Sequence, residues 1–190
     1  MSSDRDAVKG PATFEDLLDL PDHVVGEILG GELHVTPRPA VRHANAGSVL
    51  GSGLNTAFHQ GSGGPGGWWI LYEPALHLAE DVDVPDLAGW RRERLPRLPD
   101  EAYLTLAPDW VCEILSPSTE RIDRLKKLRI YARESIGHAW LVNPVARTLE
   151  VFRLDGERWM LLATHGEDEA VRAEPFDAVE IDLGRLWAME

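Results

Sequence analysis

The sequence predicts an α/β (α+β) fold in which a mixed central β-sheet is flanked by helices. Three observations support this prediction. Short β-prone runs occur along most of the 190 residues, and helical spacing of apolar residues appears at the start and in the middle of the chain. Residues 110–115 are apolar on both faces apart from one glutamate, which marks a buried central strand. Strands combined with helices in this way pack as layers around one core.

Composition sets limits on the protein class. Hydrophobic residues make up 44% of the chain and charged residues 27%, which predicts a single domain over residues 11–190 after a flexible N-terminal tail, residues 1–10. No run approaches the roughly 20 apolar residues of a membrane helix. The single cysteine excludes an intrachain disulfide, and without a secretory signal the cytoplasm is the expected location. The net charge of −13 argues against binding nucleic acid by bulk electrostatics, so a phosphate-bearing substrate would need a local basic patch or a metal ion.

The first half of the chain begins with a capping box, Thr13 followed by Asp16, which predicts a short helix. Gly30-Gly31 lies between two β-prone runs and predicts a hairpin. The remaining elements expected here are strands at 23–29, 32–36, 68–72 and 75–78 and a helix at about 41–58. The glycine-rich stretch between them, residues 61–67, lacks the Gly-Lys-Ser/Thr ending of a phosphate-binding loop and is interpreted as a connector.

The second half is expected to contain more strand than helix. A strand is predicted over residues 82–88, followed by a loop rich in arginine and proline. The buried strand at 110–115 stops at Ser116-Pro117-Ser118-Thr119, which supplies a cap for a helix that runs to about Glu134. Further strands are expected at 138–142, 148–153 and 158–163, and the rest as short strand and terminal helix.

Three carboxylates stand where acids are unexpected. Strand side chains alternate between faces, so Glu113 shares a buried face with Val111 and Leu115. If the strand stays regular across Pro85, Asp86 shares a face with apolar residues in the same way, whereas Asp83 falls on the opposite, solvent-facing side. Glu27 is the third acid, because Val25 and Leu29 share its face.

A buried carboxylate needs a compensating partner, because burying an unpaired one costs several kcal/mol. Each acid taken alone could be a core salt bridge. Three on separate strands favour a convergent site, and hard divalent cations such as Mg²⁺ or Mn²⁺ prefer oxygen ligands of this kind.

The helix that follows Glu113 carries further charge. Ile122, Leu125, Leu128 and Ala132 are expected to form its packing face, flanked by Lys127 and Tyr131. Spacing alone favours a surface ion pair between Asp123 and Lys127. Lys126, Arg129 and Arg133 form a basic stripe, which together with Arg91, Arg92, Arg94 and Arg97 is either a phosphate-binding patch or a solvated charged face.

Several segments resemble one family in order and spacing. They are residues 27–33, His43 after a proline-rich turn, Val84-Pro85-Asp86-Leu87, residues 108–119, then Asp123, Lys127, Tyr131-Ala132 and residues 140–144. Over roughly residues 13–187 the chain resembles the bacterial Uma-type restriction endonucleases, which belong to the PD-(D/E)XK nuclease superfamily. Two residues depart from the family pattern: Asn143 stands where Asp is usual, and Ser135 where Gly is usual.

The resemblance implies a restriction-endonuclease-like core and a metal-dependent endonuclease acting on DNA rather than RNA. Asp86, Glu113 and the backbone carbonyl of Ile114 would hold Mg²⁺ or Mn²⁺, and Glu27 would assist. Leu115 stands where a strand lysine would be expected, so the catalytic lysine implied is Lys127 on the next helix, with Lys126 as the fallback. His43, Lys126 and Arg129 are the candidates for binding phosphate, and a homodimer would be typical of the fold.

Two other function classes remain open at this stage. A catalytically silent module with the nuclease fold would bind DNA or a protein partner, and metal binding would separate it from the enzyme. A two-carboxylate glycosidase would need no divalent ion and would leave Lys127 without a role.

Overall fold

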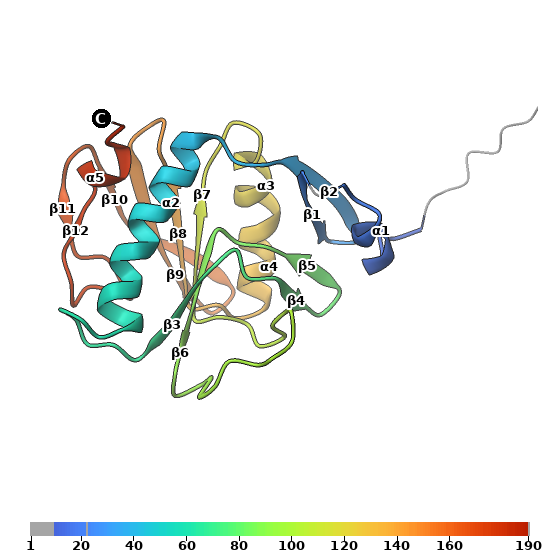
Figure 1. Cartoon of the computed structure of the whole chain (residues 1–190), viewed down its shortest axis with the longest axis horizontal. Coiled ribbons are helices and arrows are strands. Elements are labelled where there is room, and N and C mark those ends of the chain that lie inside the picture. Colours follow the sequence, from blue (N-terminus) through green and yellow to red (C-terminus); the bar gives the residue numbers. More distant parts are fainter. Residues whose placement is uncertain (1–9, 22, 190) are drawn as a thin grey trace, which may run out of the picture.

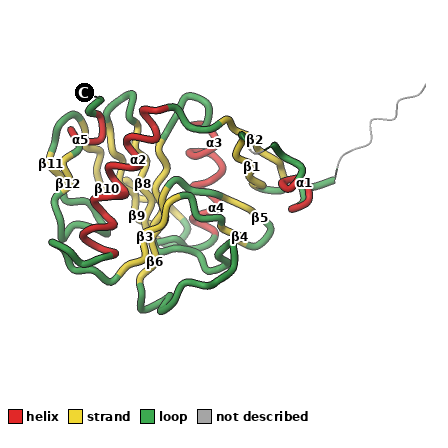
Figure 2. Tube along the Cα trace, in the orientation of Figure 1, coloured by secondary structure: helices red, strands yellow, loops and turns green. Residues whose placement is uncertain are grey.

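The computed structural model describes residues 10–21 and 23–189, so nearly all of the predicted tail, residues 1–10, lies outside the described residues. The strands form two main sheets, and helices pack against them (Figures 1 and 2). The helical elements are α1 (Phe14–Leu18), α2 (Val41–Leu54), the π-helical η1 (Asn55–His59), α3 (Glu120–Ile122), the π-helical η2 (Asp123–Lys127), α4 (Leu128–Arg133) and α5 (Gly184–Trp187).

A six-stranded sheet forms the centre of the molecule, in the order β10-β9-β8-β7-β6-β3. Its strands are β3 (Trp68–Tyr72), β6 (Leu87–Arg91), β7 (Trp110–Ile114), β8 (His138–Asn143), β9 (Thr148–Asp155) and β10 (Arg158–Gly166). β7 and β8 pair in parallel and the other neighbours are antiparallel, so the sheet is mixed, as predicted. A two-stranded ribbon, β11 (Ala170–Val171) and β12 (Ile181–Asp182), precedes α5.

Strand β7 is buried on both faces, which confirms the prediction from its composition. Trp110, Cys112 and Ile114 join the hydrophobic cluster that contains Leu50 and Leu54 of α2. Val111 joins the opposite cluster, with Ile130 and Tyr131 of α4. Glu113 has the parity of Val111, so its carboxylate is directed to the side of the sheet covered by the α3–α4 helical segment.

A second sheet lies at one end of the molecule, in the order β2-β1-β5-β4 (Figure 1). Its strands are β1 (Val24–Leu29), β2 (Glu32–Pro37), β4 (Leu76–Leu78) and β5 (Asp81–Asp83). The predicted hairpin is present: β1 and β2 pair across Gly30 and Gly31, whose φ values of 63° and 77° suit glycine in a tight turn. The hairpin joins β5 through the pair Ile28 and Val82.

The single strand predicted over residues 82–88 is wrong. The segment forms two strands, β5 and β6, which belong to different sheets. Residues 84–86 separate them, and Pro85 cannot donate a ladder hydrogen bond, so pairing ends there and the chain crosses between the sheets. Asp86 therefore lies in the break rather than within a regular strand.

The helix after β7 also differs from the predicted pattern. It spans residues 120–133 but opens into the π-helical segment η2, where the extra residue per turn changes which side chains face the sheet. Leu125, predicted to pack, is 48% exposed, whereas Lys127 and Tyr131 are buried. The predicted surface ion pair between Asp123 and Lys127 is wrong for the same reason, because both side chains are buried.

Candidate active site

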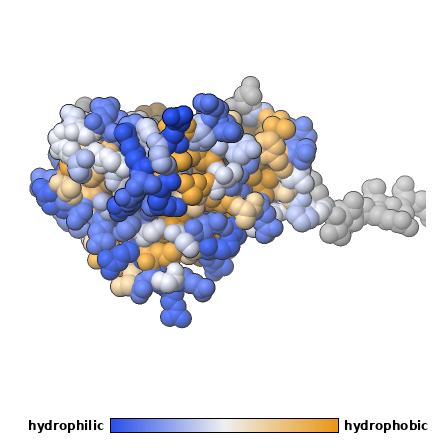
Figure 3. All heavy atoms as spheres, turned by 90° about the horizontal axis from the view of Figure 1, so that it is seen from below, coloured by the Kyte–Doolittle hydropathy of each residue, from blue (hydrophilic) through white to orange (hydrophobic). Residues whose placement is uncertain are grey.

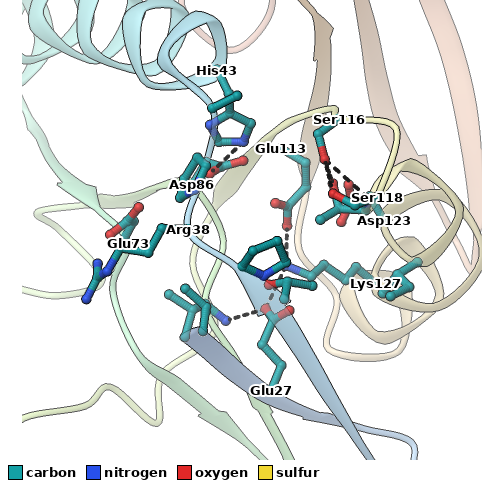
Figure 4. Close-up of a pocket in the computed structure, with 18 of the residues that line it drawn as sticks. Glu27, Arg38, His43, Glu73, Asp86, Glu113, Ser116, Ser118, Asp123 and Lys127 are labelled. Carbon is teal, nitrogen blue, oxygen red and sulfur yellow. Dashed lines mark hydrogen bonds and ion pairs between the residues drawn. The ribbon is translucent and has the colours of Figure 1, made fainter. Parts of the chain in front are cut away.

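A cavity of about 320 Å³ lies where the hairpin, the β5–β6 break, the end of β7 and the α3–η2 segment meet (Figure 4). Charged and titratable side chains from these elements, from α2 and the turn before it, and from the end of β3 line it: Glu27, Arg38, His43, Glu73, Asp86, Glu113, Asp123 and Lys127. The structure thus brings together Glu27, Asp86, Glu113 and Lys127, the four residues expected to form the active site.

Lys127 is the buried cation of this site. Its Nζ lies 2.7 Å from Glu27 Oε1, 3.1 Å from Asp83 Oδ1 and 3.4 Å from Glu113 Oε1. All four side chains are at most 7% exposed. One ammonium group therefore faces carboxylates from β1, β5 and β7, which are brought together by the fold and are far apart in sequence.

Asp83 was expected to face solvent, and this prediction is wrong. Asp81 and Asp83 are the buried positions of β5, and Val82 lies between them with partial exposure. Asp81 accepts hydrogen bonds from Arg133 Nη2 at 2.6 Å and from the Gly30 amide at 2.5 Å, and Asp83 pairs with Lys127. The parity counted back from Asp86 does not apply to β5, because the strand ends before Pro85.

Tyr131 is a further member of the cluster. Its hydroxyl donates a short hydrogen bond to Glu113 Oε1, and both side chains are buried. Sequence reasoning placed Tyr131 only on the flank of the packing face. A useful signal was its spacing of four residues from Lys127, which puts both side chains on one side of the helical segment.

Asp86 lies beside the end of β7. Its Oδ2 accepts a hydrogen bond from the Ile114 amide at 2.6 Å, and its Oδ1 lies 3.3 Å from His43 Nε2. In the antiparallel register Leu87 is opposite Cys112, so the next position places Asp86 next to Glu113. His43, predicted to contact phosphate, projects from the first turn of α2 toward Asp86 (Figure 4).

Residues 12–184 match the family described as Uma2, "Putative restriction endonuclease". The chain belongs to this family. No curated protein matches the sequence. The fold is similar to the crystal structure of a "putative nuclease belonging to DUF820" from Anabaena variabilis ATCC 29413, with a TM-score of 0.73 and 22% sequence identity over 93% of this chain and 98% of the other.

Family membership confirms the resemblance seen in the sequence, and the structural similarity confirms the predicted restriction-endonuclease-like fold class. Among the described residues, no helix is both long enough and apolar enough to cross a membrane.

The cluster holds more carboxylates than cations. Burial raises the pKa of Glu113 well above its usual range, although Lys127 opposes this. Burial likewise raises the pKa of Glu27 to about 7 and that of Asp123 to about 6. Burial also acts against the charged form of Asp83, but the charge of Lys127 and the hydrogen bonds of Glu27, Tyr131 and Lys127 together outweigh it, so the pKa of Asp83 is lowered. Without a further cation, protons must therefore neutralise part of the cluster.

The carboxylates around Lys127 and His43 raise the pKa of both side chains. Burial would lower the pKa of Lys127, but the carboxylates of Asp83, Glu113 and Glu27 raise it well above the usual value. For His43, burial is likewise outweighed by the hydrogen bond and charge of Asp86, so its pKa is raised. Lys127 is thus an ammonium group at neutral pH and has no free electron pair to act as a base.

The Glu27→Gln variant should show how much of the pH dependence of folding stability comes from the Glu27 carboxyl group. The folded protein holds a proton on Glu27 up to about pH 7, whereas the unfolded chain releases it near 4.5. The stability that this proton provides is complete below pH 4.5 and is lost as pH rises through 7. Between pH 5 and 8, in EDTA, the free energy of unfolding of the wild type should fall by at least about 1.4 kcal/mol more than that of the variant. This amount is the equivalent of one pKa unit.

Urea unfolding of both proteins at pH 5 and pH 8 measures this difference. The pKa values of His34, His77 and His138 are lowered by burial and give the opposite pH trend, but they are common to both proteins and cancel in the comparison. A difference between the two proteins that is unchanged with pH would contradict a protonated Glu27.

The donor set suits a hard divalent cation. Asp86 and Glu113 adjoin each other at the cavity. The hydrogen bonds and the ion pair of Glu113 with described residues all use Oε1, which leaves Oε2 for a ligand. No group of three or more His, Cys, Asp or Glu residues in the described chain is arranged to hold a metal ion. Mg²⁺ commonly takes one or two carboxylates and completes its shell with water and substrate phosphate, so two carboxylates are sufficient.

The predicted basic patch is largely engaged in intramolecular contacts. Lys126 Nζ lies 2.7 Å from Glu32 Oε2 and 3.0 Å from His34 Nε2. Arg133 pairs with Asp81, while Arg129 is exposed. In the loop after β6, Arg94 pairs with Asp109 at 2.9 Å and the guanidinium group of Arg92 lies over Trp69. Arg91, the last residue of β6, lies over Trp68. These contacts favour a structural role for most of the patch.

Proposed function

We propose that this protein is a metal-dependent endonuclease that hydrolyses phosphodiester bonds in DNA. The observation that carries the proposal is the meeting of Asp86 and Glu113 at one cavity, with the Lys127 ammonium 3.4 Å from Glu113. The family described as "Putative restriction endonuclease" supports the same reaction class.

Asp86 and Glu113 would hold Mg²⁺ or Mn²⁺, and the Ile114 carbonyl is the third ligand proposed from the family resemblance. A divalent cation at this position supplies Lewis-acid stabilisation of a phosphate and makes a nearby water more acidic. The Ile114 amide fixes Asp86 Oδ2, and the Tyr131 hydroxyl fixes Glu113 Oε1, so both carboxylates are oriented before any ligand binds.

Lys127 would stabilise negative charge that develops on the phosphate, or orient the attacking water, because it remains protonated. Glu27 acts through Lys127 as a positioning residue. Its Oε1 lies 2.7 Å from Lys127 Nζ and also accepts a hydrogen bond from the Val84 amide at 3.0 Å. The hairpin thus fixes the lysine relative to the β5–β6 break.

A cleavage assay with metal substitution tests the proposal. Purified protein is incubated with single-stranded and double-stranded DNA in Mn²⁺, in Mg²⁺ and in EDTA, beside the Asp86→Asn variant. Cleavage should require the divalent ion and should fall roughly 10²–10³-fold in the variant, the typical cost of losing one group that stabilises transition-state charge. Cleavage that persists in EDTA, or equally in the variant, would show a contaminating nuclease and refute the assignment.

A catalytically silent nuclease-fold module is the second candidate. It is favoured by one observation, namely that the described residues contain no preformed set of three metal ligands. Isothermal titration calorimetry with Mn²⁺ separates the two. Binding that is lost in the Asp86→Asn variant supports the enzyme, whereas absence of binding together with absence of cleavage supports the module.

A further inference from the structure

The active-site cavity is small and acidic, and it has few cations available to a substrate. We infer that the protein acts on unpaired, single-stranded DNA rather than on the intact double helix. This inference builds on the proposed function and specifies the substrate of the same site.

The proposed catalytic groups lie deep in the cavity. Glu113 and Lys127 are 3% and 4% exposed, so the groups proposed to act on the phosphate lie at the inner end of the cavity. A volume of about 320 Å³ is at the lower end of the range for small-molecule sites, about 300–1,000 Å³. A phosphate must therefore enter the cavity to reach them. One nucleotide of a flexible strand can turn inward, but extracting it from a duplex costs a few kcal/mol of unstacking and unpairing.

The rim of the cavity is formed by two turns. They are residues 38–40 between β2 and α2, next to Thr36 and Pro37 at the end of β2, and residues 116–119 between β7 and α3. Figure 4 shows Arg38 of the first turn and Ser118 of the second on either side of Glu113. Both turns are fixed to regular elements, and the second is closed by two hydrogen bonds, one between Ser116 Oγ and Ser118 Oγ at 2.9 Å and one between Ser116 Oγ and Thr119 Oγ1 at 3.0 Å. A rigid duplex resting on these turns would keep its phosphates away from Glu113.

The charge of the cavity also disfavours a duplex. A duplex presents one phosphate charge per about 1.7 Å of its axis, and proteins that bind it neutralise several phosphates at once. Five carboxylates line the cavity, against Lys127, Arg38 and His43. On the neighbouring helical segment, Arg124 pairs with Glu120 and Glu150, and Lys126 pairs with Glu32. Arg42 on α2 and Arg121 and Arg129 on the helical segment are exposed outside the cavity. The cavity itself thus offers little positive charge along which two phosphate backbones could lie.

Rates on matched substrates test this inference. The wild-type protein, with Mn²⁺, is given a labelled single-stranded oligonucleotide, the same oligonucleotide in a blunt duplex, and bis(p-nitrophenyl) phosphate as a small phosphodiester. The single strand should be cleaved at least about tenfold faster than the duplex, a factor that corresponds to about 1.4 kcal/mol. The small phosphodiester should also be hydrolysed, because it needs only the cavity.

The salt dependence gives an independent readout. A protein that makes six to ten phosphate contacts loses about 10³–10⁵ in affinity between 50 and 200 mM salt. A substrate that contacts the protein through only one or two phosphates should change its apparent affinity by less than about tenfold over the same range. Equal or faster cleavage of the duplex, or a steep salt dependence, would overturn the inference and leave the nuclease assignment intact. If none of the three substrates is hydrolysed, the proposed function itself is overturned, and the inference with it.

Discussion

Replacing Glu113 by glutamine is expected to abolish Mn²⁺-dependent cleavage while leaving the metal-free protein at least as stable as wild type. Burial raises the pKa of Glu113 well above its usual range, which favours the neutral, protonated side chain in the metal-free protein. Glutamine has the same shape and is also neutral, and its amide oxygen can accept the Tyr131 hydrogen bond. The variant cannot become the anion that a divalent cation requires, so activity should fall by roughly 10²–10³ or more.

Activity and thermal unfolding measured on the same preparation distinguish a chemical role from a structural one. The matched control is Glu120→Gln, which removes a carboxylate that is 41% exposed and pairs with Arg124 outside the cavity. The control should cleave at nearly the wild-type rate. Cleavage by the Glu113→Gln variant within about threefold of wild type would remove Glu113 from the reaction, and a large loss of metal-free stability would assign it a structural role instead.

Replacing Lys127 by methionine is expected to destabilise the fold as well as to remove activity. The methionine fills similar space but leaves Asp83 fully buried without its cation. Breaking a buried ion pair by removing one partner typically costs about 3–5 kcal/mol. Some of this loss should be recovered at low pH, where the carboxyl groups of the cluster take up protons. Urea unfolding at pH 5 and pH 8 measures both effects.

Two further variants serve as controls for the lysine. Lys126→Met removes the neighbouring ammonium, which is 35% exposed and pairs with an exposed glutamate, so stability should barely change. In the Lys127→Met background, Asp83→Asn removes the uncompensated charge and should restore part of the lost stability. If Lys127→Met unfolds at the same urea concentration as wild type, the lysine does not compensate the cluster in the way its contacts indicate.

The core of the fold could be predicted from sequence because local patterns dominate there. The run at 110–115 is apolar on both faces, and a strand of that kind occupies the centre of a sheet. The Gly30-Gly31 turn and the Thr13–Asp16 capping box depend on residues close together in sequence, and the structure contains both. Glu113 was recognisable for the same reason, as the one charge in a buried strand.

The rest of the candidate site depends on where the strands and helices depart from regularity. Alternation was carried through Pro85, so Asp83 was assigned to solvent although it lies on a separate strand and faces Lys127. The π-helical segment likewise moved Leu125 outward and Lys127 inward. Pro85 is a local signal for the first irregularity, but it does not tell whether the strand bends or ends there. The π-helical segment has no such local signal. The family resemblance, which reflects the whole chain, identified Lys127 where spacing alone favoured a surface pair.

The π-helical segment η2 also has a consequence for how the gene can change. A π-turn is equivalent to one residue inserted into an α-helix, and each residue of an α-helix turns the chain by about 100°. A one-residue deletion within residues 124–126 would restore regular helical winding and rotate the lysine relative to the helix that precedes it. Every acidic side chain of the cluster would still be encoded, yet the ammonium group would no longer face all of them. In this lineage, conservation of length across that segment should therefore be as strict as conservation of the residues themselves.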